Sequence, residues 1–420
     1  MNVLKTVKGF ADLFPPQSNL YTFMENTARS VFSAHGYLEL RLPILEYTEL
    51  FQRGIGTDTD IVGKEMFTFP DRKGRSLTLR PEATAGVVRA YIENGCQSRE
   101  KVSRFFTCGP MFRYERPQAG RMRQFHQINC ECIGAPEAQT DAEILLMLMT
   151  FLGDLGIGNL RLDMNTLGCH VCRPAYRQTL DAFLAALDQD KLCPDCRRRL
   201  VTNPLRVLDC KEPGCKEITA SAPAVRDHVC ADCAAHFATV LDILDAEKQP
   251  CHINPRLVRG LDYYTRTTFE VVATNIGAQG AVAGGGRYDG LARDLGGPDV
   301  PGIGFACGME RLALLLGARK GGSLAPRPDF YFVILEEACA KRALFAARVL
   351  RRAGLAGTGD FSPGSLKSKL RLAARAGARY CMILGESELA KQEVLIKNMD
   401  EGSQAFVPLA DLAHWASGLF

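Results

Sequence analysis

The stretch Leu257–Glu270, with the sequence LVRGLDYYTRTTFE, gathers side chains that could bind a small polar ligand. Arg259 keeps its charge at any working pH and carries a planar fork of donors that suits a phosphate or a carboxylate. Asp262, Tyr263 and Tyr264 follow closely, and a tyrosine offers a ring face and a hydroxyl that both donates and accepts. This combination indicates a ligand with an aromatic or heteroaromatic part. The alternative is a surface strand whose two tyrosines pack on the core.

The stretch Phe112–Gln127, FRYERPQAGRMRQFHQ, is the densest basic part of the chain. Bidentate arginine contacts suit the phosphate or carboxylate groups of a ligand. A run of charges is usually a solvated face, but Phe112, Met122 and Phe125 alternate with the polar residues and favour a two-faced ribbon of two strands. The polar residues are Arg113, Arg116, Gln118, Arg121, Arg123, Gln124 and Gln127.

Eight of the 16 cysteines form four pairs, CHVC, CPDC, CKEPGC and CADC, between positions 169 and 233. Three CxxC pairs and one wider pair would fill two tetrahedral zinc sites of four thiolates each. Free reduced thiols, or an iron–sulfur or redox role, are the alternatives. If zinc is bound, we expect the outer pairs to share one site and the inner pairs the other. The two sets are Cys169, Cys172, Cys230 and Cys233, and Cys193, Cys196, Cys210 and Cys215.

Hydrophobic periodicity predicts the elements that must position these residues. The predicted helices are Asn19–His35, Thr140–Leu155, Tyr176–Leu187, His236–Ala246, Ala338–Ala353 and Leu366–Ala376. The predicted strands are Leu38–Leu42, Met66–Phe69, Ser76–Leu79, Arg161–Leu167, Phe330–Leu335, Tyr380–Leu384 and Glu393–Lys397. Gly302–Leu312 predicts a glycine-rich strand that enters a helix, and the aperiodic stretch Gly317–Pro328 predicts a linker.

Composition indicates an ordinary globular protein of two to four domains: 420 residues, 46% apolar and 23% charged. The net charge of +4 is too small to argue for nucleic acid by itself. No window reaches the length of an apolar membrane span, and the N-terminus lacks a secretory pattern, so we expect a cytoplasmic protein. In a reducing compartment the cysteines are not expected to form disulfides. A Walker-type phosphate loop is absent from the sequence.

Five strings of the sequence resemble, in order, the landmarks of the histidyl-tRNA synthetases, a family of class II aminoacyl-tRNA synthetases. They are RPEATAG (Arg80–Gly86), FRYERPQAGRMRQFHQ, LVRGLDYY, AGGGRYDGL (Ala283–Leu291) and GFACGMERL (Gly304–Leu312). The tail Ser365–Leu389 resembles the anticodon-binding domain of that family, and NPLRVLD (Asn203–Asp209) resembles its helical insertion, which touches the tRNA acceptor arm. The cysteine set is not part of the family pattern, so its metal interpretation depends on spacing alone.

The resemblance implies an α+β fold: a class II synthetase-like antiparallel sheet flanked by helices, a helical insertion and a C-terminal mixed α/β domain. We expect catalytic parts at 1–168 and 251–318, the insertion at 169–250, a linker at 319–328 and the anticodon-binding domain at 329–420. It also implies a homodimer, built through the first helix, the strand and Pro43, that uses ATP, Mg²⁺, L-histidine and tRNA(His).

The resemblance assigns roles to residues that match the family motifs. Arg113, Arg259 and Arg311 are the expected catalytic residues, since the first two would brace the α-phosphate and the third the γ-phosphate; Arg121 would join Arg113 and Arg311 in binding ATP. Glu131, on the same strand face as Gln127, would accept from an imidazole N–H, whereas His126 is expected to be structural. The expected histidine-binding residues are Glu82, Thr84, Arg113, Gln127, Glu131, Arg259, Tyr263, Tyr264 and Tyr288. The expected tRNA contacts are Arg116, Gln118 and Arg123 at the acceptor end and Lys367, Lys369 and Arg371 in the C-terminal domain.

One alternative function is a non-catalytic, synthetase-like subunit that senses histidine and regulates its biosynthesis. Such paralogues are expected to lose the arginine of the LVRGLDYY string and the C-terminal domain. This chain has Arg259 and a C-terminal α/β pattern, which favours the enzyme. At Thr84, the alternative to a binding role is a helix cap.

Overall fold

The computed structural model describes residues 3–56, 59, 61–118, 120–274, 280–324 and 327–419. The chain divides into two units, Met1–Leu324 and Ala325–Phe420. The described helices include none that is long and apolar enough to cross a bilayer.

An eight-stranded sheet forms the centre of the first unit. Neighbouring strands are antiparallel except at the two edges, where β1 pairs with β5 and β7 with β8 in parallel. This confirms the mainly antiparallel sheet expected from the sequence. In spatial order the strands are β1 (Leu38–Glu39), β5 (Ser103–Phe112), β6 (Gln124–Ile133), β11 (Gly302–Gly308), β10 (Ala281–Arg287), β9 (Thr265–Ala273), β7 (Leu160–Thr166) and β8 (Cys251–Ile253).

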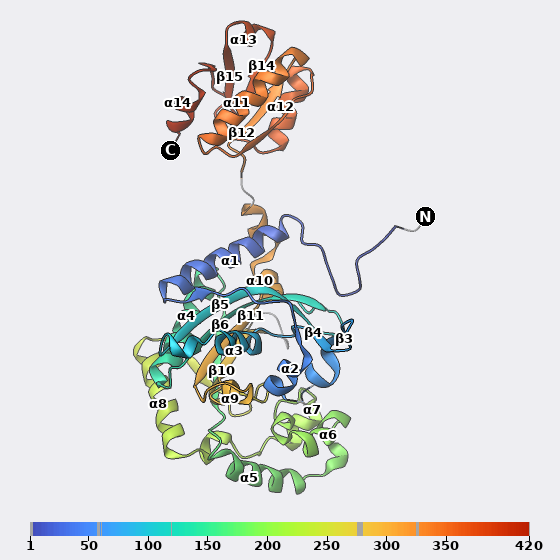
Figure 1. Ribbon diagram of the computed structural model, residues 1–420, viewed down its shortest axis with the longest axis vertical. Coiled ribbons are helices and arrows are strands. Elements are labelled where there is room, and N and C mark those ends of the chain that lie inside the picture. The colour runs from blue at the N-terminus through green and yellow to red at the C-terminus, as the bar shows by residue number, and fades with distance from the viewer. Residues whose placement is uncertain are drawn as a thin grey trace. The chain divides into compact units, whose positions relative to one another are not determined.

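Helices cover both faces of this sheet (Figure 1). On one face, α1 (Gln17–Ala34) and α4 (Ala138–Asp154) bury apolar residues in a core shared with α8 (Ala231–Ala246) and α10 (Met309–Ser323). In α1 the buried residues follow the helical period that predicted this helix, because only one stripe faces the sheet. On the other face, α3 (Thr84–Glu93) and α9 (Leu291–Asp294) pack around three tyrosines.

A small three-stranded sheet lies beside the large one and contains the predicted hairpin. Its strand order is β2 (Leu45–Tyr47), β4 (Ser76–Leu79) and β3 (Phe67–Pro70). Helix α2 (Thr48–Ile55) follows β2 directly and is hydrogen-bonded to β4 through the hydroxyls of Thr48 and Thr78. The strand expected over Leu38–Leu42 is shorter than predicted, because only Leu38 and Glu39 pair with β5.

The cysteine-rich segment is built from short helices with turns between them. The helices are α5 (Arg173–Ala185), α6 (Pro194–Thr202) and α7 (Pro213–Ile218), and the segment ends in α8. They share a small core of their own, which contains three buried cysteines beside four buried leucines.

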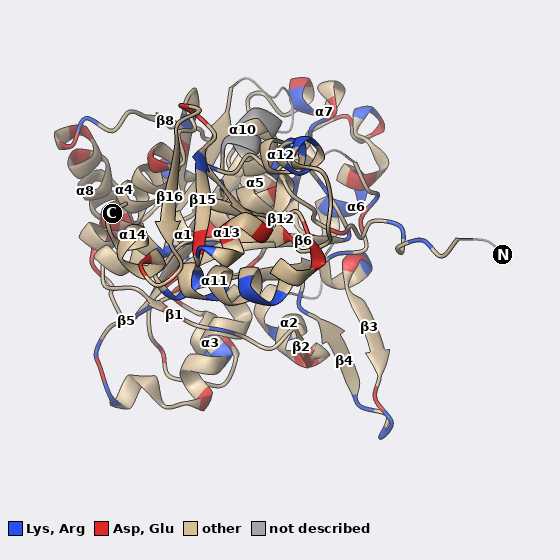
Figure 2. Ribbon diagram, turned by 90° about the horizontal axis from the view of Figure 1, so that it is seen from above, with Lys and Arg blue, Asp and Glu red and all other residues tan. Residues whose placement is uncertain are grey.

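The second unit is a five-stranded mixed sheet with helices. Its order is β13 (Gly357–Asp360), β12 (Phe330–Ile334), β14 (Tyr380–Leu384), β15 (Glu393–Asn398) and β16 (Gln404–Pro408), and the first three are parallel. The helices are α11 (Ala340–Arg352), α12 (Leu366–Arg375), α13 (Glu386–Ala390) and α14 (Leu412–Ser417). Lysine and arginine residues are prominent on α11 and α12 (Figure 2).

Two expectations near this unit need correction. The predicted linker from Gly317 is partly helical, since α10 continues to Ser323 across a non-helical Gly317 with φ +71°. Lys369, expected to contact RNA, is buried: its Nζ lies 2.8 Å from Oδ2 of Asp360 and 3.1 Å from the Ser362 hydroxyl. A buried, paired ammonium group is not available to a phosphate.

Candidate active site

A pocket of about 400 Å³, counted with its open mouth, lies on the face of the large sheet that α3 covers. The structure brings all nine residues that were expected to bind histidine into its lining. The lining residues are Glu82, Thr84, Arg113, Gln127, Asn129, Glu131, Arg259, Leu261, Tyr263, Tyr264, Gly284, Tyr288, Gly304, Phe305 and Ala306.

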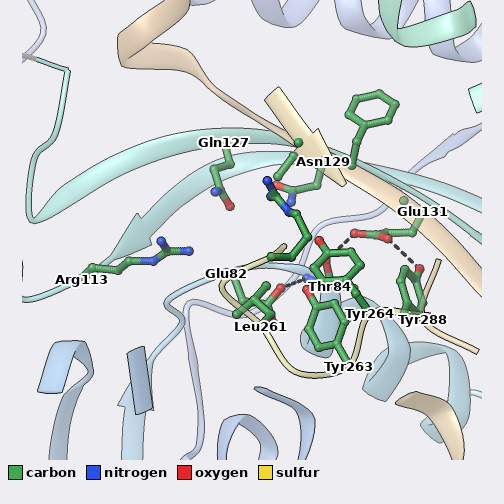
Figure 3. A pocket seen from close by; sticks show the side chains of 15 residues that line it. Glu82, Thr84, Arg113, Gln127, Asn129, Glu131, Leu261, Tyr263, Tyr264 and Tyr288 are labelled. Carbon is green, nitrogen blue, oxygen red and sulfur yellow. Dashed lines mark hydrogen bonds between the residues drawn. The ribbon is translucent and has the colours of Figure 1, made fainter. Parts of the chain in front are cut away.

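One end of the pocket is closed by the carboxylate of Glu131 (Figure 3). The hydroxyls of Thr84 and Tyr288 donate to its two oxygens at 2.7 Å and 2.6 Å. Burial raises the pKa of Glu131 to about 8, against the opposing effect of these two hydrogen bonds. A carboxyl with this pKa can exchange a proton near neutral pH, as groups at functional sites often do.

Glu82 holds the start of α3. Its carboxylate accepts from the backbone N–H groups of Thr84 at 2.6 Å and Ala85 at 2.9 Å. Burial raises the pKa of Glu82, and the two N–H groups oppose that effect. Thr84 is the first residue of α3 and Ala83 is the N-cap; the Thr84 hydroxyl donates to Glu131, which argues against a simple helix cap.

Strand β6 supplies a row of polar side chains at every second residue. Gln127 and Glu131 share one strand face as predicted, and Asn129 lies between them in the pocket lining. Within the described residues, Oε1 of Gln127 and both polar side-chain atoms of Asn129 are buried without a hydrogen-bond partner. Because buried polar groups are nearly always paired, these atoms indicate where a polar ligand binds. The sequence analysis missed Asn129, although the same alternation that linked Gln127 to Glu131 passes through it.

The segment Leu257–Tyr264, here called the signature loop, alternates between two surroundings. Arg259, Leu261 and Tyr263 line the pocket, whereas Gly260 and Asp262 line a second, smaller cavity on the side of α6. Arg259 donates to Glu270 at 3.3 Å, and its guanidinium carbon lies 5.6 Å from the centre of the Tyr264 ring. Its Nε is buried without a partner among the described residues. Glu270 was not identified from the sequence.

Glycines make room for the side chains of the pocket. A Cβ atom added at Gly304 would lie 1.7 Å from Oε2 of Glu131, and one added at Gly284 would lie 2.5 Å from Nη1 of Arg259. Any larger residue at these positions would displace the polar groups that line the pocket.

Three arginines gather at the end of the pocket away from Glu131. Arg113 lines that end (Figure 3) and donates from Nε to the carbonyl of Pro81 at 2.9 Å. Arg311, at the start of α10, does not line the pocket but is close enough for burial and the charges of Arg121 and Arg113 to lower its pKa. Three positive charges close together suit the binding of a polyanion such as a nucleoside triphosphate.

The hairpin loop between β5 and β6 has a mixed surface. Arg116 and Gln118 are exposed. Arg123 is half-buried, and its guanidinium carbon lies 3.9 Å from the centre of the Tyr114 ring. His126 is structural, as expected: its backbone N–H donates to Glu310 at 2.8 Å and its ring packs on Tyr21.

The eight clustered cysteines form the two sets that spacing predicted. The basal cluster is Cys169, Cys172, Cys230 and Cys233; the distal cluster is Cys193, Cys196, Cys210 and Cys215. In the basal cluster the Sγ–Sγ distances Cys169–Cys172, Cys169–Cys230 and Cys172–Cys233 are 3.7, 3.9 and 4.0 Å. Sulfurs of a tetrahedral Zn–S₄ site would lie about 3.8 Å apart, whereas a disulfide needs about 2.05 Å. Both sets therefore have the spacing of a tetrathiolate metal site.

These features together define a class II aminoacyl-tRNA synthetase. They are a mainly antiparallel sheet with helices on both faces, a hairpin that carries an arginine on one side of the pocket, and a second arginine where a strand enters a helix. Comparison with known proteins agrees. A family model described as histidyl-tRNA synthetase matches residues 9–312, and one described as anticodon binding domain matches residues 329–419.

Individual relatives cover nearly the whole chain. A histidine–tRNA ligase of Nitratidesulfovibrio vulgaris (strain DP4) is 61% identical over 404 residues, 96% of each chain. One of Oleidesulfovibrio alaskensis is 60% identical over 409 residues, 97% of this chain and 98% of the relative. The crystal structure of apo S. aureus histidyl-tRNA synthetase matches with a TM-score of 0.82 and 33% identity, over 99% of this chain and 100% of the other. The chain belongs to the histidyl-tRNA synthetase family and is an aminoacyl-tRNA synthetase.

Proposed function

We propose that this enzyme activates L-histidine with ATP to histidyl-adenylate and then transfers the histidyl group to the 3′ end of tRNA(His). The observation that carries the proposal is Glu131, a buried carboxyl at the closed end of the pocket, opposite Arg113. A carboxylate in this position can accept a hydrogen bond from an imidazole N–H. An arginine at the other end can donate to phosphate and carboxylate groups.

Recognition of the ring depends on buried polar groups. Glu131, which the Tyr288 hydroxyl holds at 2.6 Å, accepts from one imidazole N–H. The Tyr264 hydroxyl serves the other side of the ring, with Tyr263 packed against Tyr264. An apolar amino acid would leave the buried carboxyl without its partner, which typically gives strong discrimination. Glu82, Thr84 and Gln127 hold the α-ammonium group.

In the activation step an oxygen of the histidine carboxylate attacks the α-phosphorus of ATP. The new P–O bond forms as the bond to the β-phosphate oxygen breaks, and pyrophosphate leaves with the electron pair. Arg113 and Arg259 stabilise the charge that grows on the α-phosphate, and Arg121 and Arg311 bind the β- and γ-phosphates. Mg²⁺ would accompany ATP and neutralise part of the phosphate charge. Glu115 and Glu270, which form ion pairs with Arg121 and Arg259, are carboxylates that would help to hold it.

Transfer to tRNA follows in the same site. The ribose hydroxyl attacks the histidyl carbonyl carbon, the bond to the phosphate oxygen breaks, AMP leaves, and the adenylate phosphate takes the hydroxyl proton. Among the described residues of the pocket lining there is no histidine or lysine, and the carboxylates Glu82 and Glu131 already accept hydrogen bonds. Arg116, Gln118 and Arg123 contact the acceptor end. In the second unit, Lys367 and Arg371 remain candidates for anticodon contacts, with the basic side chains of α11 (Figure 2).

We also propose that the enzyme is a homodimer that acts in the cytoplasm, with 169–250 as an insertion between the catalytic parts 1–168 and 251–318 and with 329–420 as the anticodon-binding domain. Apolar side chains of the first strands are exposed, which supports an interface there. They are Leu38, Ile44, Leu45 and Tyr47. None of the 16 cysteines, all of which lie in the described residues, forms a disulfide, which fits a reducing compartment.

The two cysteine clusters are proposed to hold structural zinc, one ion each. Support comes from the sulfur distances above and from the donor set, since four thiolates favour zinc or iron over harder cations. Zinc content of the purified protein tests this: two ions per chain are expected without visible absorption, whereas an iron–thiolate spectrum would assign iron, and metal-free protein would contradict the proposal.

ATP–pyrophosphate exchange with each of the 20 common amino acids tests the catalytic function. We expect exchange with histidine alone, nearly abolished in Arg259→His and unchanged in Arg293→His, an exposed arginine outside the pocket. Exchange with no amino acid, while histidine still binds, would favour the regulatory subunit instead.

A further inference from the structure

We propose that the insertion, ordered by the metal ions of its two cysteine clusters, is the rigid backing of the signature loop, so that histidine affinity depends on metal occupancy. This inference rests on the proposed histidine site and the proposed zinc ions. It concerns the outer face of the loop, which does not line the histidine pocket.

The insertion contacts that outer face at both ends. Nη2 of Arg173 donates to the carbonyl oxygen of Tyr264 at 2.6 Å, so it fixes the backbone of a residue whose ring lines the pocket. Nδ2 of Asn203 donates to Oδ1 of Asp262 at 2.7 Å. Just before the loop, Arg256 donates to the carbonyl of Thr219 at 2.7 Å. The loop is therefore held between the pocket on one side and the insertion on the other.

Arg173 depends on the basal cluster for its position. It is the first residue of α5 and follows Cys172 directly. Its Nε is buried without a partner among the described residues, and its Nη2 is held by the Tyr264 carbonyl. The position of this side chain therefore depends on where the chain just before α5 lies. The Cys169–Cys172 pair, joined to Cys230 and Cys233 through a metal ion, would fix it.

A second connection runs from the basal cluster into the sheet. His236 lies one helical turn after Cys233 in α8. Its Nε2 is 2.8 Å from Oδ2 of Asp141, and Asp141 also pairs with Arg287, the neighbour of the pocket residue Tyr288. The helix that carries Cys233 of the basal cluster is thus linked, through Asp141, to the strand end that precedes Tyr288.

The insertion has little apolar core to hold itself rigid. In residues 169–250, all of which the structure describes, the separate core contains ten buried residues, three of them cysteines of the distal cluster. Units with so small a core usually need a metal ion or a disulfide, and metal binding in such units is coupled to folding. Loss of the ions would therefore loosen the backing and, with it, the signature loop.

The first experiment changes the backing without touching a thiol. Arg173→Ala is expected to weaken histidine binding about ten-fold, as for loss of a hydrogen bond from a charged donor, while ATP affinity and metal content stay unchanged. Arg173→Lys should recover part of the affinity. Arg177→Ala is the matched control, because Arg177 is exposed one turn further along α5 and pairs only with Asp181 among the described residues. Unchanged histidine affinity in Arg173→Ala would overturn the inference.

The second experiment removes a metal ligand. Cys230→Ser is expected to carry one metal ion fewer, to bind histidine more weakly in equilibrium dialysis and to exchange amide hydrogens of residues 257–264 faster. Cys251→Ser, outside both clusters, should change none of these. Normal histidine binding and exchange in metal-deficient Cys230→Ser would overturn the coupling and leave the zinc proposal intact. Metal-free wild type would overturn both, and wild type that holds two ions but does not bind histidine would contradict the proposed function instead.

Discussion

Histidine affinity should rise with pH between 7 and 8, because Glu131 must lose a proton to accept from the ring. With a pKa of about 8 in the empty pocket, about ten carboxyls are protonated for each ionised one at pH 7. Ionising Glu131 then costs about 1.4 kcal/mol at pH 7 and about 0.4 kcal/mol at pH 8. The difference corresponds to an affinity about five-fold higher at pH 8, and the histidine ring itself is mostly neutral over this range.

Isothermal titration calorimetry of histidine binding at several pH values, in buffers of different ionisation enthalpy, measures both the affinity and the proton released. Glu131→Gln should bind weakly and show no such slope. Tyr288→Phe removes a hydrogen bond that lowers the pKa of Glu131. In this variant the increase in histidine affinity should therefore occur at higher pH. A flat profile, or tighter binding at lower pH, would refute the reasoning, since the carboxyl would then bind the ring as a donor.

The same pKa predicts a pH dependence of stability. A carboxyl whose pKa is higher in the folded state than in the unfolded chain stabilises the fold while protonated, and this stabilisation is lost as pH rises through about 8. The melting temperature of Glu131→Gln relative to wild type should therefore be higher at pH 8.5 than at pH 6. A pH-independent difference would contradict this.

Three further changes test particular contacts. Gly304→Ala should abolish measurable histidine binding, because its Cβ would overlap the pocket carboxylate, whereas Gly308→Ala on the same strand, with open space around it, should not; equilibrium dialysis measures both. Asp141→Asn should lower the free energy of unfolding of the first unit by about 1.5–3 kcal/mol in urea titrations, since it removes the buried charge partner of Arg287 and leaves only the partly exposed Asp289. Lys369→Met should destabilise the second unit by about 1–3 kcal/mol because it removes a buried hydrogen-bonded charge, whereas Lys367→Met should leave stability unchanged and weaken tRNA binding in a filter assay.

The sequence predicted best the features that depend on local periodicity. Helix α1 and the strand face shared by Gln127 and Glu131 follow from spacing along one element, so they could be identified without the rest of the fold. The segment after Leu38 could not, because whether an alternating segment pairs over its full length depends on its neighbour, and here β5 accepts only two residues. Glu270 was missed for a related reason: its role depends on a hydrogen bond from Arg259, 11 residues earlier, that spacing alone does not predict.

Lys369 shows where a helical pattern is ambiguous. On periodicity alone, a lysine among Lys367 and Arg371 belongs to a solvated basic face. The structure buries it because Asp360 at the end of β13 and the turn after it supply acceptors at the right depth. Sequence spacing gives the direction of a side chain from its own helix, but the partner that decides between solvent and an ion pair lies on another element.

The glycines of the pocket extend this argument to the active site. In the sequence, GGG is typical of a turn, which would need no particular neighbour, whereas GIG predicts a strand. In the structure both lie in strands, β10 and β11, and the missing side chains are replaced by the guanidinium of Arg259 and the carboxylate of Glu131. The central strands therefore leave space for polar groups delivered by other elements. Specificity for the ring then depends as much on the absence of two Cβ atoms as on the presence of a carboxylate, which is why Gly304→Ala should be as damaging as removal of Glu131 itself.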